Sequence, residues 1–262
     1  MGITSFNLKL QIPNDVPEHN QFIPAQNLES QEWLDQIQKW TENQKMLINK
    51  KKTNCMIFNY TDKYQFTTRL KLDDDTVQVI DSTRLLGTII NNDLTWDLHT
   101  ENIIKKANAR MALLLPVASF GTSEDELINI YILFIRSLLE QSAVVWHSSL
   151  NQENSQDLER VQKSALKVIC GEKYLGYKKS LDKLQLQTLY DRRDTLCLNF
   201  AKGCTKNPKF SDMFPKNNKN HPMELRNPEQ YQVIHANTER FRNSAIIHMQ
   251  HLLNEDADKY SK

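Results

Sequence analysis

The sequence predicts an α+β protein in which a helix and a small antiparallel β meander come first and a series of helices follows. Apolar residues recur at helical spacing from Asn27, alternate with polar residues between 66 and 90, and return to helical spacing after Trp96. Strands and helices that are segregated along a chain are typical of the α+β class. We therefore expect an irregular segment over 1–26, a helix with strands over 27–93, a helical part over 94–202, and a polar, partly disordered segment with one helix over 203–262.

The first helix is expected to run from Asn27 to about Gln44, with Asn27 or Ser30 as its N-cap. Its apolar side is formed by Leu34, Ile37 and Trp40. A buried strand is expected at 56–58, because three apolar residues stand together there. The meander continues with alternating residues at Phe66, Thr68, Leu70, Leu72, Val77 and Val79, a turn at Asp73–Asp75, and a third strand over 85–90.

The helical part is expected to contain four helices, and a fifth is expected near the end of the chain. Ser123 with Glu126 forms a capping box that opens the second of the four, and Gly171 can end the third. The fourth is expected from Leu184 to Ala201. The apolar stripes are Ile104, Ala107, Met111, Leu114 and Ala118; Leu127, Tyr131, Phe134, Leu138 and Val145; Leu158, Val161, Ala165 and Val168; and, in the last helix, Phe241, Ala245, Met249 and Leu252.

Composition excludes several classes of function. Lys and Arg total 33 against 32 Asp and Glu, so any nucleic-acid site has to be local. With only six glycines, a glycine-rich phosphate loop is not expected. No apolar stretch approaches the length of a membrane span, and the first residues do not resemble a secretory signal. The four cysteines form no CxxC pair, so we expect reduced thiols in an intracellular protein.

The candidates for chemistry each have an ordinary structural explanation. Asp73–Asp75 could bind Mg²⁺, but a solvated turn explains the triplet better. Cys197, Cys204, His221 and His235 could form a zinc site, but their spacing is irregular, and we expect no metal site. His99 and His147 are interpreted as packing or surface residues.

Local basic clusters are the remaining candidates. One is the run Lys50–Lys52 before a strand, and the other lies on the helix near residue 105, opposite its apolar stripe. Both clusters could neutralise phosphates, although composition alone favours the explanation that they are solvated faces. The second cluster consists of Lys105, Lys106 and Arg110.

Several segments, in their order and spacing, resemble one family. They are Met46–Phe58, Thr83–Ala107, Ile130–Gln162 and Leu189–Arg193, and together they are similar to the reverse transcriptase of non-LTR (LINE-type) retrotransposons. The similar region covers about residues 26 to 202 and corresponds to the part of such enzymes that follows the catalytic Asp-Asp motif.

The resemblance implies roles for particular residues. Lys52, in an Asn-x-x-Lys-Thr pattern, would lie near the incoming triphosphate, and Leu86 with Gly87 would match the primer grip. Helices from about 99 to 170 would form the thumb, with Lys105, Lys106 and Arg110 along the nucleic-acid backbone.

The catalytic carboxylates of the family do not have matching positions here. Members hold two Mg²⁺ ions with an Asp pair and an upstream Asp, but the 26 residues before the first helix contain only Asp15. The resemblance therefore implies a fragment without catalysis or cofactor of its own, which binds an RNA–DNA duplex weakly and belongs with a missing palm and fingers portion. No membrane partner is expected.

Two alternatives remain open. The chain could be a non-catalytic helical protein-interaction module. It could also lack a selected function and fold poorly, exposing an apolar face made of Met46, Ile57, Phe58 and Leu86.

Overall fold

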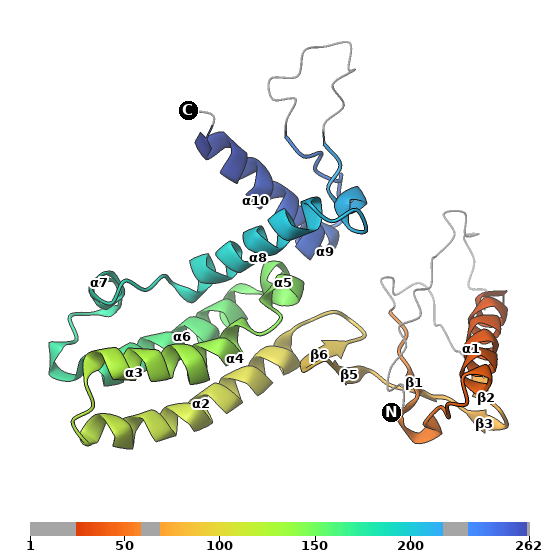
Figure 1. Cartoon of the computed structure of the whole chain (residues 1–262), viewed down its shortest axis with the longest axis horizontal. Coiled ribbons are helices and arrows are strands. Elements are labelled where there is room, and N and C mark those ends of the chain that lie inside the picture. Colours follow the sequence, from red (N-terminus) through yellow and green to blue (C-terminus); the bar gives the residue numbers. More distant parts are fainter. Residues whose placement is uncertain (1–24, 59–68, 217–229, 261–262) are drawn as a thin grey trace, which may run out of the picture. The chain divides into compact units, whose positions relative to one another are not determined.

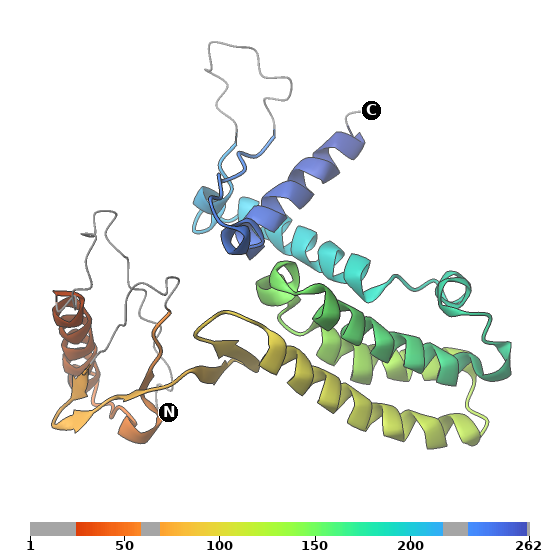
Figure 2. The same ribbon diagram turned by 180° about the vertical axis from the view of Figure 1, so that it is seen from behind.

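The protein forms two compact units, Met1–Thr95 and Trp96–Lys262 (Figures 1 and 2). The computed structural model describes residues 25–58, 69–216 and 230–260. Unit 1 combines one helix with short strands, and unit 2 is helical. The expected combination of helices and strands is therefore confirmed.

Unit 1 is organised around helix α1 (Ala25–Asn43), which matches the expected first helix closely. Ser30 does not cap this helix but lies buried inside it. Leu34 packs with Leu70, Leu72 and Val77 in a small core, which partly buried Ile48 and Cys55 extend. The helix is also tied to a strand, because the amide of Gln31 exchanges two 2.8 Å hydrogen bonds with the backbone of Lys71. By contrast, Trp40 is half exposed and lies outside the core.

The strands of unit 1 do not form the expected meander. Within the described residues they make three separate pairs, of which one is parallel. The two antiparallel pairs connect residues that are near in sequence, as hairpins do. The pairs are β1 (Asn54–Cys55) with β4 (Gln78–Val79), β2 (Lys71–Leu72) with β3 (Asp75–Thr76), and β5 (Ser82–Leu85) with β6 (Thr88–Asn91).

Two expectations for the strands were wrong in detail. Residues 56–58 are not a strand, and Phe58 is exposed. Val77 and Val79 do not share a face, because the chain leaves β3 before it enters β4, so that Val77 is buried and Val79 exposed. The turn at 73–74 is confirmed, with Asp73 in the left-handed region. Phe66 and Thr68 lie outside the described residues.

The expected third strand, 85–90, is a hairpin. The chain reverses at Leu86 (φ 49°) and Gly87 (φ 91°), and Leu85 pairs with Thr88 across the turn. Positive φ at both central residues is the requirement of a type I′ turn, which matches the right-handed twist of the two strands. Gly87 meets this requirement without strain, whereas Leu86 does not.

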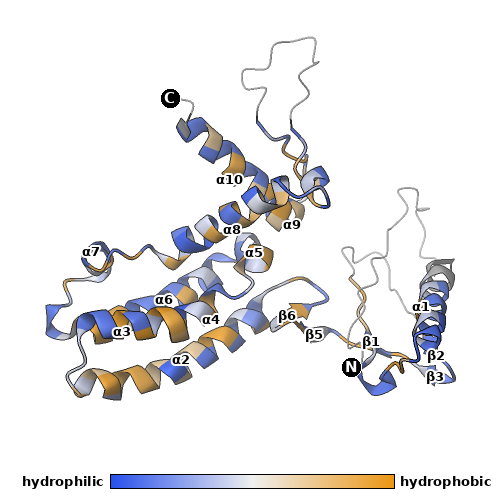
Figure 3. Cartoon of the chain, in the orientation of Figure 1, coloured by the Kyte–Doolittle hydropathy of each residue, from blue (hydrophilic) through white to orange (hydrophobic). Residues whose placement is uncertain are grey.

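Unit 2 begins with a bundle in which α2, α3, α4 and α6 run side by side (Figures 1 and 2). Orange apolar residues occur on each of these helices in Figure 3. The helices are α2 (Asp97–Ser119), α3 (Glu124–Ile130), the π-helix η2 (Tyr131–Arg136), α4 (Ser137–Glu140), α5 (Ala143–Trp146), η3 (His147–Ser149), α6 (Gln152–Cys170), η4 (Gly171–Lys173), α7 (Tyr177–Lys183), α8 (Leu189–Thr205), η5 (Ser211–Met213), α9 (Glu239–Arg242) and α10 (Ala245–Tyr260); in unit 1, η1 spans Lys50–Lys52.

The helix after the capping box buries a different stripe from the one expected. The capping box itself is confirmed, with Ser123 and Glu126 bonding reciprocally. The π-helix η2 widens each turn, so residues four apart stay on one side for longer than in an α-helix. Phe134 consequently turns outward and is 56% exposed, whereas Leu138 is half-buried. The buried stripe is Leu127, Tyr131, Ile135, Leu139 and Ala143.

Several helix boundaries are set by single backbone positions. Ser142 is left-handed and separates α4 from α5, so the expected continuous helix to Val145 is broken. Gln185 is also left-handed, and α8 therefore begins at Leu189 with Thr188 as its N-cap. Gly171 ends α6, as expected. In α2, Ile103 rather than Ile104 is buried.

The C-terminal helices pack on α8. The expected last helix is divided at Asn243–Ser244 into α9 and α10. Met249 and Leu253 of α10 meet Cys197, Ala201 and Cys204 of α8 in one apolar cluster that also contains Phe214.

One helical stretch, 124–149, is long and apolar enough to cross a membrane, by length and composition. No membrane span was expected from the sequence. Of the apolar window in this stretch, 22% is buried inside the described structure, and the stretch contains an ion pair between Arg136 and Glu140 at 3.1 Å.

Replacing Leu86 with Asn should stabilise the β5–β6 hairpin by about 1 kcal/mol, because Asn tolerates the left-handed region better than Leu. Slower amide exchange at Thr83–Leu85 and Thr88–Ile90 would measure this. Leu47 is equally exposed, at 90%, but has no positive φ. The matched change Leu47→Asn should therefore leave hairpin exchange unaltered, and equal effects of both changes would contradict the strain at Leu86.

Candidate functional site

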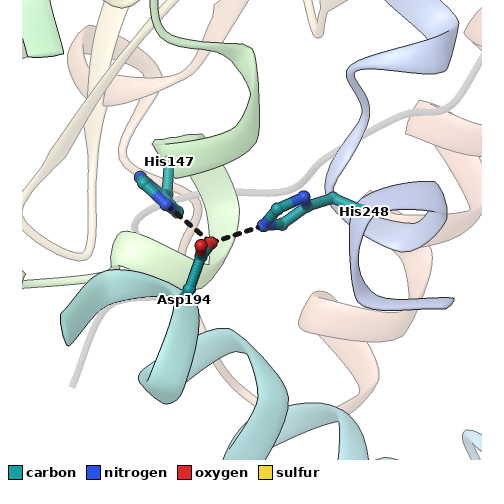
Figure 4. A group of neighbouring side chains, drawn as sticks. All are labelled: His147, Asp194 and His248. Carbon is teal, nitrogen blue, oxygen red and sulfur yellow. Dashed lines mark hydrogen bonds and ion pairs between the residues drawn. The ribbon is translucent and has the colours of Figure 1, made fainter. Parts of the chain in front are cut away.

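Three polar side chains from separate segments of unit 2 meet at one point (Figure 4). His147 lies in η3, Asp194 in α8 and His248 in α10. Asp194 Oδ1 accepts hydrogen bonds from His147 Nε2 at 3.0 Å and His248 Nε2 at 2.8 Å. His147 is buried, whereas Asp194 and His248 retain about a quarter of their side-chain exposure. One carboxylate oxygen therefore connects three segments that are far apart in sequence.

Arg193 determines where the proton of His147 lies. Its Nε donates to His147 Nδ1 at 3.0 Å. A guanidinium only donates, so Nδ1 of His147 accepts and its ring proton is on Nε2, directed at Asp194. Arg193 is fully buried, with its guanidinium 5.7 Å from the ring centre of Trp146. The result is a chain of contacts, Arg193–His147–Asp194–His248, which we call the His–Asp–His network.

The protonation states in this network follow from burial and hydrogen bonding. Burial lowers the pKa of His147, and the adjacent Arg193 charge lowers it further, which outweighs the Asp194 hydrogen bond. Burial alone would raise the pKa of Asp194, but the two histidine hydrogen bonds hold it well below its usual range. Asp194 is therefore charged and His147 neutral near pH 7.

His147, Asp194 and His248 could, by residue type and proximity, hold a metal ion. The arrangement around them does not fit one. A metal-bound histidine donates its second ring N–H to an acceptor, but the second nitrogen of His147 faces the donor Arg193. His147 could bind a metal through Nε2 in this setting only as an imidazolate, beside a buried cation. The network therefore has the character of a structural and proton-holding site.

A cleft of about 670 Å³ adjoins the network, and both histidines line it. Its wall includes Asn151, Gln152 and Ser155 from the start of α6, and Thr188 and Tyr190 from the start of α8. Tyr190 packs edge-on against His147 with their ring centres 4.9 Å apart. Burial raises the pKa of Tyr190, so its hydroxyl is neutral.

A second polar network joins η2, α6, α7 and α8, and its members Tyr177 and Glu159 also line this cleft. The Tyr131 hydroxyl donates to Gln162 at 2.6 Å, and Gln162 donates to the Tyr177 hydroxyl at 2.9 Å. Tyr177 donates to Glu159, which also accepts from the Leu189 N–H at 3.2 Å. Burial raises the pKa of both tyrosines.

Most of these residues come from two of the segments that carry the family resemblance. Tyr131, Glu159 and Gln162 lie in Ile130–Gln162, and Leu189 begins Leu189–Arg193, whereas Tyr177 lies between the two segments. The Glu159 carboxylate joins the two segments by accepting the Leu189 N–H.

The predicted phosphate-binding residues lie on α2. Lys105 and Lys106 are exposed, and neither ammonium group has a hydrogen bond or ion pair within the described residues. Arg110 is also exposed, and its Nη1 donates to the backbone carbonyl of Phe134 in η2. The opposite side of the helix buries Ile103, Ala107, Met111 and Leu114.

The other predicted residues are in unit 1. Lys52 is exposed in η1, Leu86 is exposed at the hairpin tip, and Gly87 follows it. Lys50 pairs with Asp73 at 2.6 Å and Asp75 at 3.1 Å. These hydrogen bonds raise the pKa of Lys50, and those from Lys50 and Gln38 lower the pKa of Asp73. A lysine therefore occupies the place beside the Asp triplet where Mg²⁺ would bind.

The three candidate zinc ligands that the structure describes are not brought together. Cys197 and Cys204 are buried in the apolar cluster of α8 and α10, where burial raises the pKa of Cys197 to about 12. His235 is exposed, and His221 lies outside the described residues. His99 is a packing residue as expected, buried edge-on between Trp96 and Trp146 with ring centres 6.3 and 5.4 Å away.

The interpretation of His147 as only a packing or surface residue was incomplete, and Asp194 and His248 were missed. The three are separated by 47 and 54 residues, and no motif links them. The adjacent Arg193–Asp194 pair, whose charges face a helical core, was the available signal.

No family model matches the chain, and comparisons with curated proteins and with solved structures return no match.

Acid should destabilise unit 2 in two stages. The unfolded chain protonates His147 at about pH 6.5, above the folded pKa, so stability falls as pH drops below about 6.5. Asp194 adds a further loss below about pH 4, because its pKa is lowered on folding. Urea unfolding at several pH values, followed by far-UV circular dichroism, measures both stages.

His147→Gln should reduce stability at pH 7 by about 1–3 kcal/mol, because it removes a buried acceptor of Arg193. It should also flatten the loss between pH 7 and 5. The exposed His251 offers a control, and His251→Gln should preserve the wild-type profile. An unchanged slope in the His147 variant would show that another group governs the first stage.

Proposed function

We propose that unit 2 binds the sugar-phosphate backbone of a nucleic-acid duplex through the exposed side of α2. In this proposal the chain is the late palm, primer-grip and thumb portion of a reverse transcriptase of the non-LTR type. It acts inside the cell, together with a palm and fingers portion that supplies the catalytic carboxylates. Duplex binding by this chain alone is weak.

The observation that supports the proposal most is the pair of free ammonium groups on α2. Lys105 and Lys106 are exposed, and no carboxylate among the described residues neutralises them. Phosphate contacts of this kind contribute affinity without sequence preference. The buried side of α2 packs against α6, so the two lysines are carried on a rigid helix.

Arg110 adds a third positive charge to this side of α2. Its bond to the Phe134 carbonyl uses one of five guanidinium N–H groups and leaves the others available, because the residue is exposed. The contact also fixes α2 against the π-helix.

Unit 1, considered by itself, supports the proposal through two features, a hairpin turn and an exposed lysine. The hairpin turn at Leu86–Gly87 presents a side chain that is 90% exposed beside a backbone with no Cβ. A primer end could approach the backbone closely at such a turn. Lys52 is exposed and thus available to a triphosphate.

Catalysis is not part of the proposed role of this chain. Asp73 and Asp75 are held by Lys50, and the His–Asp–His network is the only group of three or more potential metal ligands within the described ranges. In this proposal, polymerisation would require Mg²⁺-binding carboxylates from a separate palm and fingers portion.

A protein-interaction module is the second candidate, and one observation favours it. Leu133 and Phe134 of η2 are 66% and 56% exposed, next to the Arg110 contact. Apolar side chains beside an arginine are typical of protein interfaces. The protein-interaction module would be favoured over duplex binding if the wild-type chain showed no affinity for duplexes.

Replacing Lys105 and Lys106 together with Gln should weaken binding to an RNA–DNA duplex. It should also make the plot of log K against log salt shallower by about 2, since each phosphate contact contributes about 0.9. Fluorescence anisotropy at several salt concentrations measures both quantities.

Lys163 and Lys167 supply a charge-matched control on the exposed side of α6. Replacing both with Gln should change the slope of log K against log salt by less than about 0.5, which is roughly half the contribution of one phosphate contact. Equal losses in the two double variants would mean that overall charge, and not the α2 surface, governs binding.

A further inference from the structure

The cleft beside the His–Asp–His network is bordered by the beginnings of three long helices. Gln152 and Ser155 belong to the first turns of α6, Tyr190 to that of α8 and His248 to that of α10. The first N–H groups of a helix lack acceptors within it and carry partial positive charge, equivalent to about half an elementary charge at each end. One N–H at each of α6 and α8 is already capped, by Asn151 and Thr188, and the Leu189 N–H is bonded to Glu159. The partial positive charge of the three helix ends still favours an anion at this cleft.

A buried cation provides the independent evidence for a ligand. Arg193 is fully buried, and its Nη1 has no hydrogen-bond partner in the described part of the chain. Its Nη2 lies 3.5 Å from Ser155 Oγ, and its Nε contacts His147, so the guanidinium lies directly behind two residues of the cleft wall.

The contact between Arg193 and Ser155 determines which way the Ser155 hydroxyl donates. Arg193 can only donate, so the Ser155 oxygen accepts, and its own hydrogen is available to an acceptor in the cleft that Ser155 lines. Ser148 lines the same cleft, and its buried hydroxyl likewise has no partner among the residues described. Both hydroxyls can donate to a bound oxygen atom.

The carboxylates near the cleft repel a bound anion only to a limited extent. Among the described residues, Glu159 is the one carboxylate in the cleft wall, and it accepts from Tyr177 and from the Leu189 N–H. Glu153 and Asp191, in the first turns of α6 and α8, are exposed and do not line the cleft. Asp194 is occupied by two histidines.

We propose that this cleft binds a phosphate-type oxyanion, held by the N-termini of α6 and α8, the hydroxyls of Ser155 and Ser148, and the charge of Arg193 behind them. The site is separate from the basic side of α2 and does not depend on the proposed duplex binding. The phosphate could belong to a small phosphorylated molecule or to the end of a nucleic-acid strand, since both present the same oxygens.

The test is a titration of the full chain with inorganic phosphate, with chloride at matched ionic strength as the reference. The His248 ring proton resonances report on the cleft directly. Phosphate should shift them in a saturable way that chloride does not reproduce. Failure of the wild-type chain to show this specific shift would overturn the proposal.

Two variants should act in opposite directions. Ser155→Ala removes a donor and should weaken phosphate binding by about 3–10-fold. Glu159→Gln keeps the shape and the acceptor oxygen for Leu189 but removes the one negative charge of the wall, and should tighten binding by about 3–10-fold. A folding defect cannot mimic tighter binding.

Glu172→Gln is the matched control, since Glu172 is exposed at the far end of α6. It should change phosphate affinity by less than about two-fold, because exposed charges beyond a Debye length are screened. If Glu159→Gln failed to tighten binding, or if Glu172→Gln tightened it equally, the anion would not be in the cleft and the proposal would be wrong.

A second pair of ligands distinguishes the two sources from which the phosphate could come. A 5′-phosphorylated oligonucleotide and the same strand without the phosphate should differ in the His248 shift if strand ends bind. Equal behaviour of the two strands, with inorganic phosphate still bound, would assign the site to small molecules. The variant Lys105→Gln/Lys106→Gln should retain phosphate binding, and its loss there would overturn the separation of the two sites.

Discussion

The buried guanidinium of Arg193 is the constraint on which the arrangement of unit 2 depends. Removing a cation from water is costly unless hydrogen bonds and nearby charges compensate it. Here the compensation comes from several segments at once: the ring of Trp146, the acceptor nitrogen of His147 and the hydroxyl of Ser155. Asp194 and Glu159 supply opposing charge from α8 and α6. These groups must be in place together, so one side chain specifies how α5, η3, α6 and α8 pack.

The same side chain extends its influence to the C-terminal helix. By accepting no proton itself, Arg193 leaves the proton of His147 on Nε2, so that His147 donates to Asp194 Oδ1, the same oxygen that binds His248 of α10. The apolar cluster of Met249 and Leu253 with α8 provides the burial that holds α10 there. Polar bonds of this kind add little net stability but penalise other packings, because each would leave a buried group without a partner.

Unit 1, in contrast to unit 2, is not organised around a buried charge. Its core consists of four buried apolar side chains in the described part, from α1, β2 and the loop between β3 and β4. A core of that size supports little independent stability. Polar contacts, such as those of Gln31 with Lys71 and of Lys50 with the Asp turn, take a large share in holding it. The strands occur as isolated pairs, which leave backbone edges that another chain could extend.

Local sequence signals determined the helices and their ends. The capping box at Ser123 and Glu126, the stop at Gly171 and the amphipathic spacing of α1 and α6 act over three or four residues, and the sequence displays them in full. The exposed side of α2 was predictable for the same reason, since helical spacing alone places Lys105 and Lys106 away from Ala107 and Met111.

Tertiary structure decided what depends on partners distant in sequence. The π-helix moved the buried stripe from Phe134 to Ile135, the strands paired as three sheets, and His147, Asp194 and His248 met around one oxygen. Periodicity describes one element at a time, whereas these features arise where several elements compete for the same space and the same hydrogen bonds.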